Sequence, residues 1–274
     1  MIAHHDKPPQ LAPLSQAHLL LVDIGNSRVA VAAWTGGKRH PAKHLPADPF
    51  SPVGELIKRM WNDLPGAGKR AVIVSSVCPT VLAELQSFCR SHDVGPVLVV
   101  GQNIDPPIAA DVDEPDKIGT DRLCVAAAAF EKVEQACVVA DFGTALTIDL
   151  VADNDVFIGG TIMPGVALAA RALNEYTAQL PLVEVGAPTD TLGKDTVSAI
   201  RNGIFAMMVG ALREVTERFA TQIGKWPILI VTGGDAQAIA SACEFVDHVA
   251  PDLCLDGLVI AYRNAAGESE DEVE

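Results

Sequence analysis

Aromatic residues and long apolar runs are both scarce in this sequence. Only 5% of its 274 residues are aromatic, although 49% are hydrophobic, so a core would have to be built mainly from Ala, Val, Leu and Ile. The apolar fraction and the length suffice for one large domain or two smaller ones. No apolar run approaches the roughly 20 residues that a membrane-spanning helix needs, so we expect no membrane span.

The sequence also has few positively charged residues. The 20 Lys and Arg residues are outnumbered by 35 Asp and Glu residues, which gives a formal net charge of −15. No stretch of the sequence is markedly basic. Proteins that bind nucleic acid through its phosphates, or that lie on anionic membranes, present clustered Lys and Arg. We therefore expect neither nucleic acid nor a membrane among the partners.

Cysteine and histidine motifs that hold metals are missing as well. The six cysteines form no Cys-x-x-Cys pair, and the seven histidines show no ligand spacing. Cys124, Cys137 and Cys254 lie in apolar surroundings and are expected to be small buried side chains. Residues 1–17 contain no apolar stretch typical of a signal peptide. Reduced thiols without such a signal favour a cytoplasmic protein.

One strand–turn–strand pattern occurs twice. Asp23–Ser27 (DIGNS) follows the apolar run Leu19–Val22, and Asp141–Ala145 (DFGTA) follows Val138–Ala140. Glycine lets the backbone approach a ligand closely, backbone N–H and hydroxyl groups can hold phosphate oxygens, and Asp can hold a cation. Taken alone, the pair fits equally a clamp for the phosphates of a nucleotide and two ordinary polar hairpins.

Apolar periodicity divides the chain into two similar halves. Each half opens with hairpin strands and continues with strand–helix units, which indicates a pseudo-duplicated α/β plan with mixed sheets. Such a protein binds its ligand in the cleft between its lobes. Residues 38–52 and 101–118 are rich in proline and are expected to be loops. The expected strands are 19–24, 28–34, 71–76, 96–100, 136–141, 145–151, 156–162 and 228–231. The expected helices are 53–62, 79–91, 123–133, one after Pro164, 196–222, a short one after Asp235, and one after Leu255.

Shorter polar motifs lie at the predicted ends of these elements. Gly119–Arg122 (GTDR) precedes a helix, which Thr120 or Asp121 could simply cap. The alternative is functional, because Asp can accept a proton and Arg can bind an anion. Gly159–Gly165 (GGTIMPG) joins a strand to a helix, where a ligand could approach the glycines and an anion could bind the helix N-terminus. A turn needed only for packing explains that motif equally well.

Two further motifs leave alternatives open. Thr232–Asp235 (TGGD) follows a buried strand, and its glycines either let a flat ring pass close to the backbone or form a plain strand–helix turn. Gly193–Thr196 (GKDT) precedes the longest predicted helix, for which Thr196 is a candidate N-cap. The motif is not a Walker A phosphate loop, because the glycine spacing that should precede Lys194 is absent.

In this order the motifs resemble those of type III pantothenate kinases, within the acetate kinase–Hsp70–actin superfamily. The resemblance covers about residues 18–262, and the ordered set is specific although each motif alone is common. It implies two ribonuclease H-like lobes of the actin-like ATPase type at 18–118 and 119–266. Outside them we expect, from composition, a flexible N-terminal extension (1–17) and a solvated, disordered acidic tail (267–274). The resemblance also implies a homodimer that phosphorylates pantothenate to 4'-phosphopantothenate with ATP, the first step of coenzyme A biosynthesis.

The resemblance further implies a role for each matched residue. Asp121 would be the general base, Asp23 would lie near Mg²⁺, and Asp141 would hold a monovalent cation, K⁺ or NH₄⁺. The residues matched to ATP are Asp23, Ile24, Gly25, Asn26, Ser27, Arg28, Val29, Ala30, Thr144, Gly233 and Gly234. The residues matched to pantothenate are Gly119, Thr120, Asp121, Arg122, Gly160 and, across a dimer interface, Thr196.

Two positions depart from the family pattern, and two other functions compete. Val112 stands about where the family has a Tyr, which would remove one hydrogen bond to pantothenate, and Leu146 replaces a small or polar residue.

Bvg accessory factor proteins share the motifs, so the alternative is a non-catalytic nucleotide-binding regulatory protein. An exopolyphosphatase-like hydrolase would need an acid positioned for water. Asp121 favours the kinase, because a protein without catalysis has no need of a base.

Overall fold

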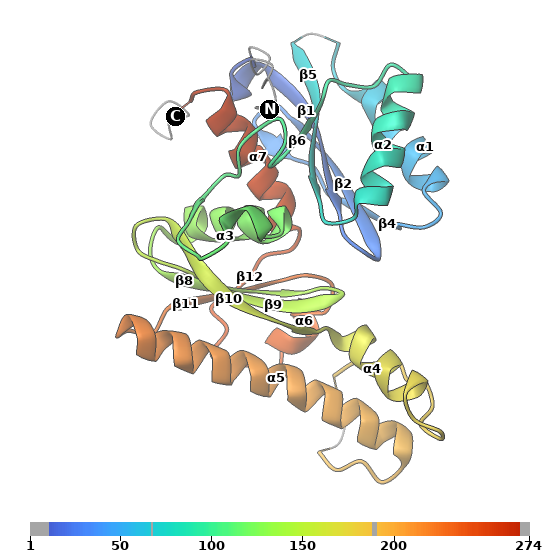
Figure 1. Cartoon of the computed structure of the whole chain (residues 1–274), viewed down its shortest axis with the longest axis vertical. Helices are drawn as coiled ribbons and strands as arrows, with labels where there is room; N and C mark the ends of the chain where they lie inside the picture. Colours follow the sequence, from blue (N-terminus) through green and yellow to red (C-terminus); the bar gives the residue numbers. More distant parts are fainter. Residues whose placement is uncertain (1–10, 67, 188–190, 269–274) are drawn as a thin grey trace. The chain divides into compact units, whose positions relative to one another are not determined.

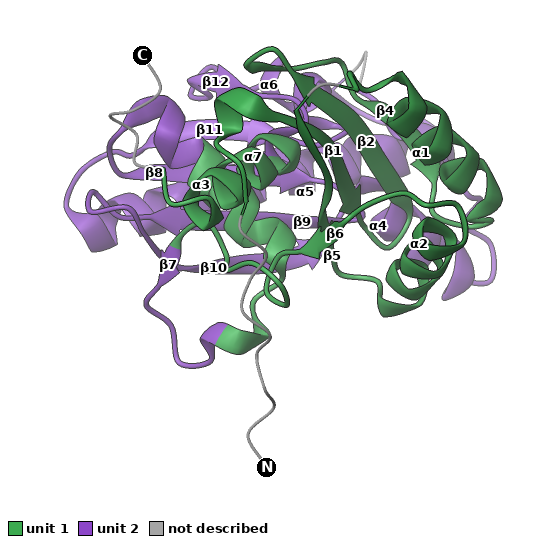
Figure 2. Cartoon of the chain, turned by 90° about the horizontal axis from the view of Figure 1, so that it is seen from above, with its two compact units in different colours: residues 1–108, 116–128, 254–274 green, residues 109–115, 129–253 purple. Residues whose placement is uncertain are grey.

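The computed structural model forms two compact units (Figure 2). Unit 1 takes in the residues up to 108, residues 116–128 and the residues from 254 onward, and unit 2 takes in 109–115 and 129–253. The predicted mixed α/β plan with two sheets is confirmed. The structure describes residues 11–66, 68–187 and 191–268.

The sheet of unit 1 is built around one antiparallel hairpin and two parallel neighbours. Strand β1 pairs antiparallel with β2 and parallel with β5, and β5 pairs parallel with β6. The strand order is β3-β2-β1-β5-β6, with β4 also paired to β2. The strands are β1 (Ala17–Ile24), β2 (Arg28–Thr35), β3 (Lys38–Arg39), β4 (Lys43–Pro46), β5 (Lys69–Ser76) and β6 (Val97–Val99).

Helices cover the sheet of unit 1 because its central strands are apolar on both faces. Helices α1 (Ser51–Asp63) and α2 (Pro79–Ser91) lie along one face (Figure 1). Alternate residues of β1, such as Leu20 and Val22, pack there with Ile57 and Leu85 in one buried cluster. Helix α7 (Leu253–Ala265) lies on the other side of the sheet.

The sheet of unit 2 repeats the plan of unit 1. Its order is β12-β11-β8-β9-β10-β7, in which β8–β9 and β9–β10 are antiparallel while β8–β11 and β11–β12 are parallel. In both units the first strand therefore has a hairpin partner on one side and a parallel strand on the other, which confirms the duplication. The strands are β7 (Ala109–Ala110), β8 (Cys137–Phe142), β9 (Ala145–Val151), β10 (Val156–Pro164), β11 (Ile228–Thr232) and β12 (His248–Val249).

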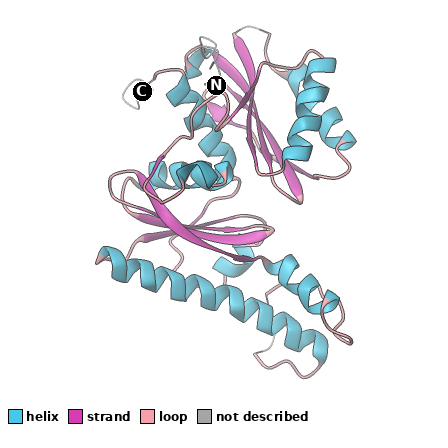
Figure 3. Ribbon diagram, in the orientation of Figure 1, coloured by secondary structure: helices cyan, strands magenta, loops and turns pink. Residues whose placement is uncertain are grey.

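Three helices pack on one face of this second sheet (Figure 3). They are α4 (Val166–Glu175), α5 (Thr196–Ile223) and α6 (Ala236–Ala240). Leu146, Ile148 and Leu150 of β9 share a buried cluster with Met208 and Leu212 of α5. Leu146 stands where the family pattern has a small or polar residue. Because its side chain is part of this buried cluster, the difference affects core packing and not a binding site.

Several predicted boundaries need correction. The lobe boundary at 118/119 does not follow the compact units, because helix α3 (Thr120–Val133) begins in unit 1 and α7 returns to it. The predicted loop 38–52 contains β3, β4 and the start of α1, and the predicted loop 101–118 contains β7 and a 3₁₀ turn at Pro115–Lys117. These short strands pair through backbone groups, which leave no apolar period to recognise.

The two chain ends are also more ordered than predicted where the structure describes them. Leu14 is buried within a 3₁₀ turn at Leu14–Gln16, and its N–H donates to the Glu268 carboxylate at 2.9 Å. Residues 1–10 of the predicted extension and 269–274 of the predicted acidic tail lie outside the described residues. None of the described helices combines the length and hydropathy that a membrane span requires.

Candidate functional site

The first repeated turn connects two strands of unit 1, as the sequence predicts. Asp23 is the last residue but one of β1, and the N–H of Gly25 donates to the Arg28 carbonyl at 3.0 Å. Asn26, Ser27 and Arg28 are exposed. The side chains of Ile24, Val29 and Ala30 are buried, so any contact of these three with a phosphate would come from their backbone.

The Gly119–Arg122 motif forms the first turn of α3 in unit 1. The helix begins at Thr120 itself, so the motif is not a segment that precedes the helix. Oδ1 of Asp121 accepts a hydrogen bond from the Arg122 N–H at 2.8 Å. A side chain at position 119 would overlap this same oxygen, which explains why the position before Thr120 is glycine.

Burial raises the pKa of Asp121 above its ordinary value of 3.8, and the Arg122 N–H and guanidinium oppose this only in part. A carboxylate with a raised pKa is a stronger base, yet it is still ionised wherever the pH exceeds that pKa. The environment of Asp121 therefore suits proton acceptance from a hydroxyl group.

Asp23 and Asp121 lie in the same part of unit 1. A hydrogen bond with Cys124, burial, and the negative charges of Asp23 and Asp121 together hold the pKa of the Cys254 thiol well above its usual range. Cys124, Cys137 and Cys254 are buried, as predicted. Ser75 is a polar neighbour of both segments: it is in register with Asp23 across β1 and β5, and it shares a 3.1 Å hydrogen bond with Thr120, the residue before Asp121.

The second repeated turn gathers three predicted motifs in unit 2. Gly143 N–H donates to the Ala145 carbonyl at 3.1 Å, which closes the turn after β8. Gly165 N–H donates to the Thr144 carbonyl at 3.1 Å, and Asp235 N–H donates to the Phe142 carbonyl at 3.4 Å. The Asp141 turn, the start of α4 and the Thr232–Asp235 turn therefore meet.

Two glycines of unit 2 are required by neighbouring carboxylates. Gly233 has a φ of +94°, and a side chain there would overlap Oδ1 of Asp141 and the backbone of Phe142. Gly160 pairs with Asp149 across β9 and β10, and a side chain there would overlap the Asp149 carboxylate. Asp149 itself is 1% exposed. Both motifs thus place backbone close to an acid.

Several predicted details are placed differently by the structure. Gly159 and Gly160 lie within β10, which continues to Pro164, and not at its end. Asp195 is the N-cap of α5 and forms a capping box with Ser198, so Thr196 is not the cap. Val112 lies in unit 2, with a methyl group 3.9 Å from the place that a side chain at Gly159 would take.

The sequence interpretation missed two buried polar residues near these motifs. Ser75 and Asp149 are 0% and 1% exposed. The available signal for each was a hydroxyl or a charge within an otherwise apolar strand, which is unfavourable unless the group is partnered. The predicted site residues thus form one group in unit 1, around Asp23 and Asp121, and one in unit 2, around Asp141.

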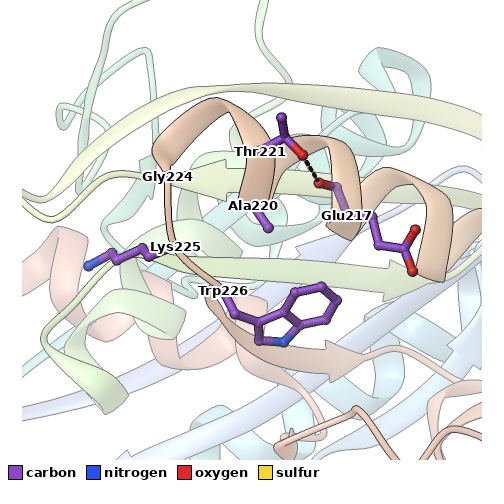
Figure 4. A pocket seen from close by; sticks show the side chains of 6 residues that line it. All are labelled: Glu217, Ala220, Thr221, Gly224, Lys225 and Trp226. Carbon is purple, nitrogen blue, oxygen red and sulfur yellow. Dashed lines mark hydrogen bonds between the residues drawn. The ribbon is translucent and has the colours of Figure 1, made fainter.

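A shallow hollow at the end of α5 contains none of these residues (Figure 4). Its lining residues are Glu217, Ala220, Thr221, Gly224, Lys225 and Trp226. The Lys225 ammonium forms an ion pair with Asp153 at 2.5 Å, and the Thr221 hydroxyl donates to the Glu217 carbonyl. This hollow is therefore not the place where the predicted motifs meet.

Comparison with known proteins extends over most of the chain. A family model described as type III pantothenate kinase matches residues 19–218. A type III pantothenate kinase of Dehalococcoides mccartyi is 34% identical over 250 residues, covering 89% of this chain and 97% of that protein. One from Rhodospirillum rubrum is 33% identical over 251 residues, covering 89% and 98%.

Among solved structures, MreB5 of Spiroplasma citri bound to ADP matches with a TM-score of 0.50 at 10% identity. The match covers 92% of this chain and 98% of MreB5. At such low identity the likeness concerns the fold alone. It confirms the actin-like ATPase fold that the resemblance implies.

Proposed function

The chain belongs to the type III pantothenate kinase family, and from that premise we propose how its residues divide the work of phosphorylating pantothenate. The reaction is ATP-dependent and belongs to coenzyme A biosynthesis. None of the comparisons favours a regulatory protein without catalysis. Purified protein with ATP and pantothenate should form 4'-phosphopantothenate and ADP, and absence of that product under all cation conditions would contradict the function.

Asp121 is the general base in this proposal. Its carboxylate accepts the proton of the primary hydroxyl of pantothenate as that oxygen attacks the γ-phosphorus of ATP. The supporting observation is the partly buried carboxylate at the first turn of α3, with its raised pKa. Gly119, Thr120 and Arg122 surround it and, with Gly160 of unit 2, are assigned to pantothenate. The Arg122 guanidinium suits an anionic group.

The two glycine turns are assigned to ATP. In unit 1 the segment from Asp23 to Ala30 offers backbone N–H groups and the exposed Asn26 and Ser27 side chains to phosphate oxygens. In unit 2 Thr144 offers a hydroxyl group, and Gly233 and Gly234 belong to the turn that packs against Asp141 and Phe142. An acidic chain that handles a polyanion requires cations to balance the charge.

The oxygen-bearing groups at the two turns fit such cations. Mg²⁺ bound with a nucleotide commonly uses only one or two protein carboxylates together with the substrate phosphates, and Asp23 at the end of β1 provides one carboxylate. Asp141 and the hydroxyl and carbonyl oxygens of Thr144 are ligands suited to K⁺ or NH₄⁺. Bound there, the cations would neutralise charge on the phosphates.

A monovalent cation should raise the rate. We expect K⁺ or NH₄⁺ titrated into a Na⁺ buffer at saturating Mg²⁺ to increase kcat, because the Asp141 turn would then hold its cation. Asp141→Asn should abolish this response. A flat response of the wild-type protein would remove the cation role from Asp141.

The functional unit is proposed to be a homodimer. The support comes from unit 2, where Met207 on α5 is 44% exposed and Tyr176, Leu182 and Leu192 are still more exposed. Thr196, assigned to pantothenate across the interface, lies exposed at the start of the same helix. Met208 takes no part, because it is buried in the core of unit 2.

Sedimentation equilibrium should therefore show a dimer. We expect Met207→Glu to shift the protein towards monomer, because the charge would be buried in the interface. The exposed Trp226, at the far end of α5, provides a control as Trp226→Glu. A monomer that is fully active at nanomolar concentration would contradict the assembly. A cytoplasmic location is part of the same proposal and is supported by six free cysteines.

A further inference from the structure

Ser75 is a polar residue in a place where its strand is otherwise apolar. Its neighbours in β5, Ala71 to Val74, are at most 4% exposed, and Ser75 itself is 0% exposed. A hydroxyl buried so completely is unfavourable unless it is hydrogen bonded. Its partner is Oγ1 of Thr120, at 3.1 Å. The hydroxyl of Ser75 thus connects the end of β5 to the first turn of α3.

The same turn is packed closely by other parts of unit 1. The Cγ2 methyl of Thr120 lies 3.2 Å from the place that a side chain at Gly101 would occupy, just after β6. Val77, immediately after β5, lies 3.4 Å from the corresponding place at Gly119. The turn that carries Asp121 is therefore seated on the ends of the parallel strands β5 and β6, and Ser75 supplies a directional contact to it.

We propose that Ser75 is a positioning residue for the kinase reaction: its hydrogen bond to Thr120 fixes the first turn of α3, and with it the direction of the Asp121 carboxylate. The inference rests on the proposed role of Asp121 as the base. Ser75 lies beside Asp23 in the register of β1 and β5, so its hydroxyl joins the strand next to the one that carries Asp23 to the helix that carries Asp121. Small misplacements of a catalytic group lower rates strongly.

The first test compares two neighbouring serines. Ser75→Ala should lower kcat about tenfold, near the upper end of the effect of one neutral hydrogen bond, with the KM for ATP unchanged within twofold. Ser76→Ala is the matched control, because the Ser76 hydroxyl bonds to the Cys78 backbone at 3.2 Å and not to α3. We expect Ser76→Ala to keep a normal kcat.

The pH profile separates positioning from general damage to the fold. Loosening the turn would let water reach Asp121, so the acid limb of kcat should move to lower pH in Ser75→Ala and stay in place in Ser76→Ala. A loss of rate with an unchanged limb and an equally lowered melting temperature in both variants would overturn the inference.

The other partner gives a second route if Ser75→Ala does not fold. Thr120→Val removes the partner hydroxyl and should lower kcat at saturating pantothenate about as far as Ser75→Ala does, apart from any change in the KM for pantothenate, to which Thr120 is assigned. The double variant Ser75→Ala/Thr120→Val should be no worse than the worse single variant, because both remove one contact. Full additivity of the two effects on kcat would overturn the inference.

These results can be told apart from failure of the proposed base. If Asp121→Asn loses activity while Ser75→Ala behaves like Ser76→Ala, Asp121 keeps its role and only the positioning role of Ser75 is wrong. If Asp121→Asn is nearly as active as the wild type, the proposed base is wrong and the inference for Ser75 is wrong with it.

Discussion

Asp121→Asn is expected to lower kcat by roughly 10²–10⁴, the usual range for loss of a general base. The amide has nearly the shape of the carboxylate, so the turn at Gly119 should persist while proton acceptance is lost. ATP binding should stay nearly normal, because Asp121 is not among the residues assigned to the nucleotide. Steady-state kinetics with pantothenate and a separate measurement of ATP affinity would check both parts.

The matched control for this variant is Asp116→Asn, an exposed acid in the 3₁₀ turn shortly before the motif. It should leave kcat and both KM values unchanged. Near-normal turnover in a folded Asp121→Asn protein would remove the base from Asp121. A large loss in both variants would point to general damage of this segment instead.

The raised pKa of Asp121 also predicts the pH dependence of activity and stability. Activity should fall as the pH drops through the raised pKa, at a higher pH than an ordinary Asp at 3.8 would give. Between the two values the folded protein holds a proton that the unfolded chain has released, so this group's contribution to stability falls as the pH rises. Asp121→Asn should therefore melt higher than the wild type at neutral pH, and the difference should shrink in acid.

Gly233→Ala should have the second large effect. The backbone at Gly233 has a φ of +94°, and the added methyl group would overlap Oδ1 of Asp141 and come within 2.6 Å of Phe142 backbone atoms. Backbone strain and overpacking together should lower the free energy of unfolding by roughly 2–4 kcal/mol. Displacement of the Asp141 carboxylate should also abolish the response to K⁺, measured in whatever protein remains folded.

Gly224→Ala separates strain from displacement. Gly224 caps α5 with a φ of +74°, but nothing lies within 4 Å of the place of its added methyl group. It should cost only about 1 kcal/mol of left-handed strain and leave the K⁺ response intact. If both variants lost stability equally and both kept the response to K⁺, the close approach of Gly233 to Asp141 would not be needed for cation binding.

The sequence predicted the regular elements well wherever an apolar period was long. β9 and α2 have the predicted ends, and α5 differs by one residue. Prediction failed for β3, β4, β7 and β12, which are two to four residues long and are held by backbone pairing. It also failed for the unit boundary, because the return of α7 to unit 1 depends on long-range packing that local periodicity does not contain.

The residues of the candidate site could be predicted from the sequence to a similar degree. The two Asp-x-Gly turns could be recognised because each follows an apolar strand and contains residues that can bind phosphate and a cation. Ser75 and Asp149 were not predicted because each is a single polar residue within an apolar strand, and the partner of Ser75 comes from another element. Whether Asp195 or Thr196 caps α5 likewise depended on side-chain geometry, since either residue type makes a good cap.

The return of α7 to unit 1 affects the order in which the protein can be completed during synthesis. Unit 1 combines the residues up to 108 and residues 116–128 with the last fifteen described residues. The Tyr262 hydroxyl of α7 donates to the Ala12 carbonyl at 3.0 Å, and Gly257 allows α7 to approach the backbone of Cys124. On the ribosome, almost all of unit 2 emerges while one face of the unit 1 sheet still lacks its helix. The chain must therefore keep the apolar surface of its first-made sheet from aggregating until its last helix is made.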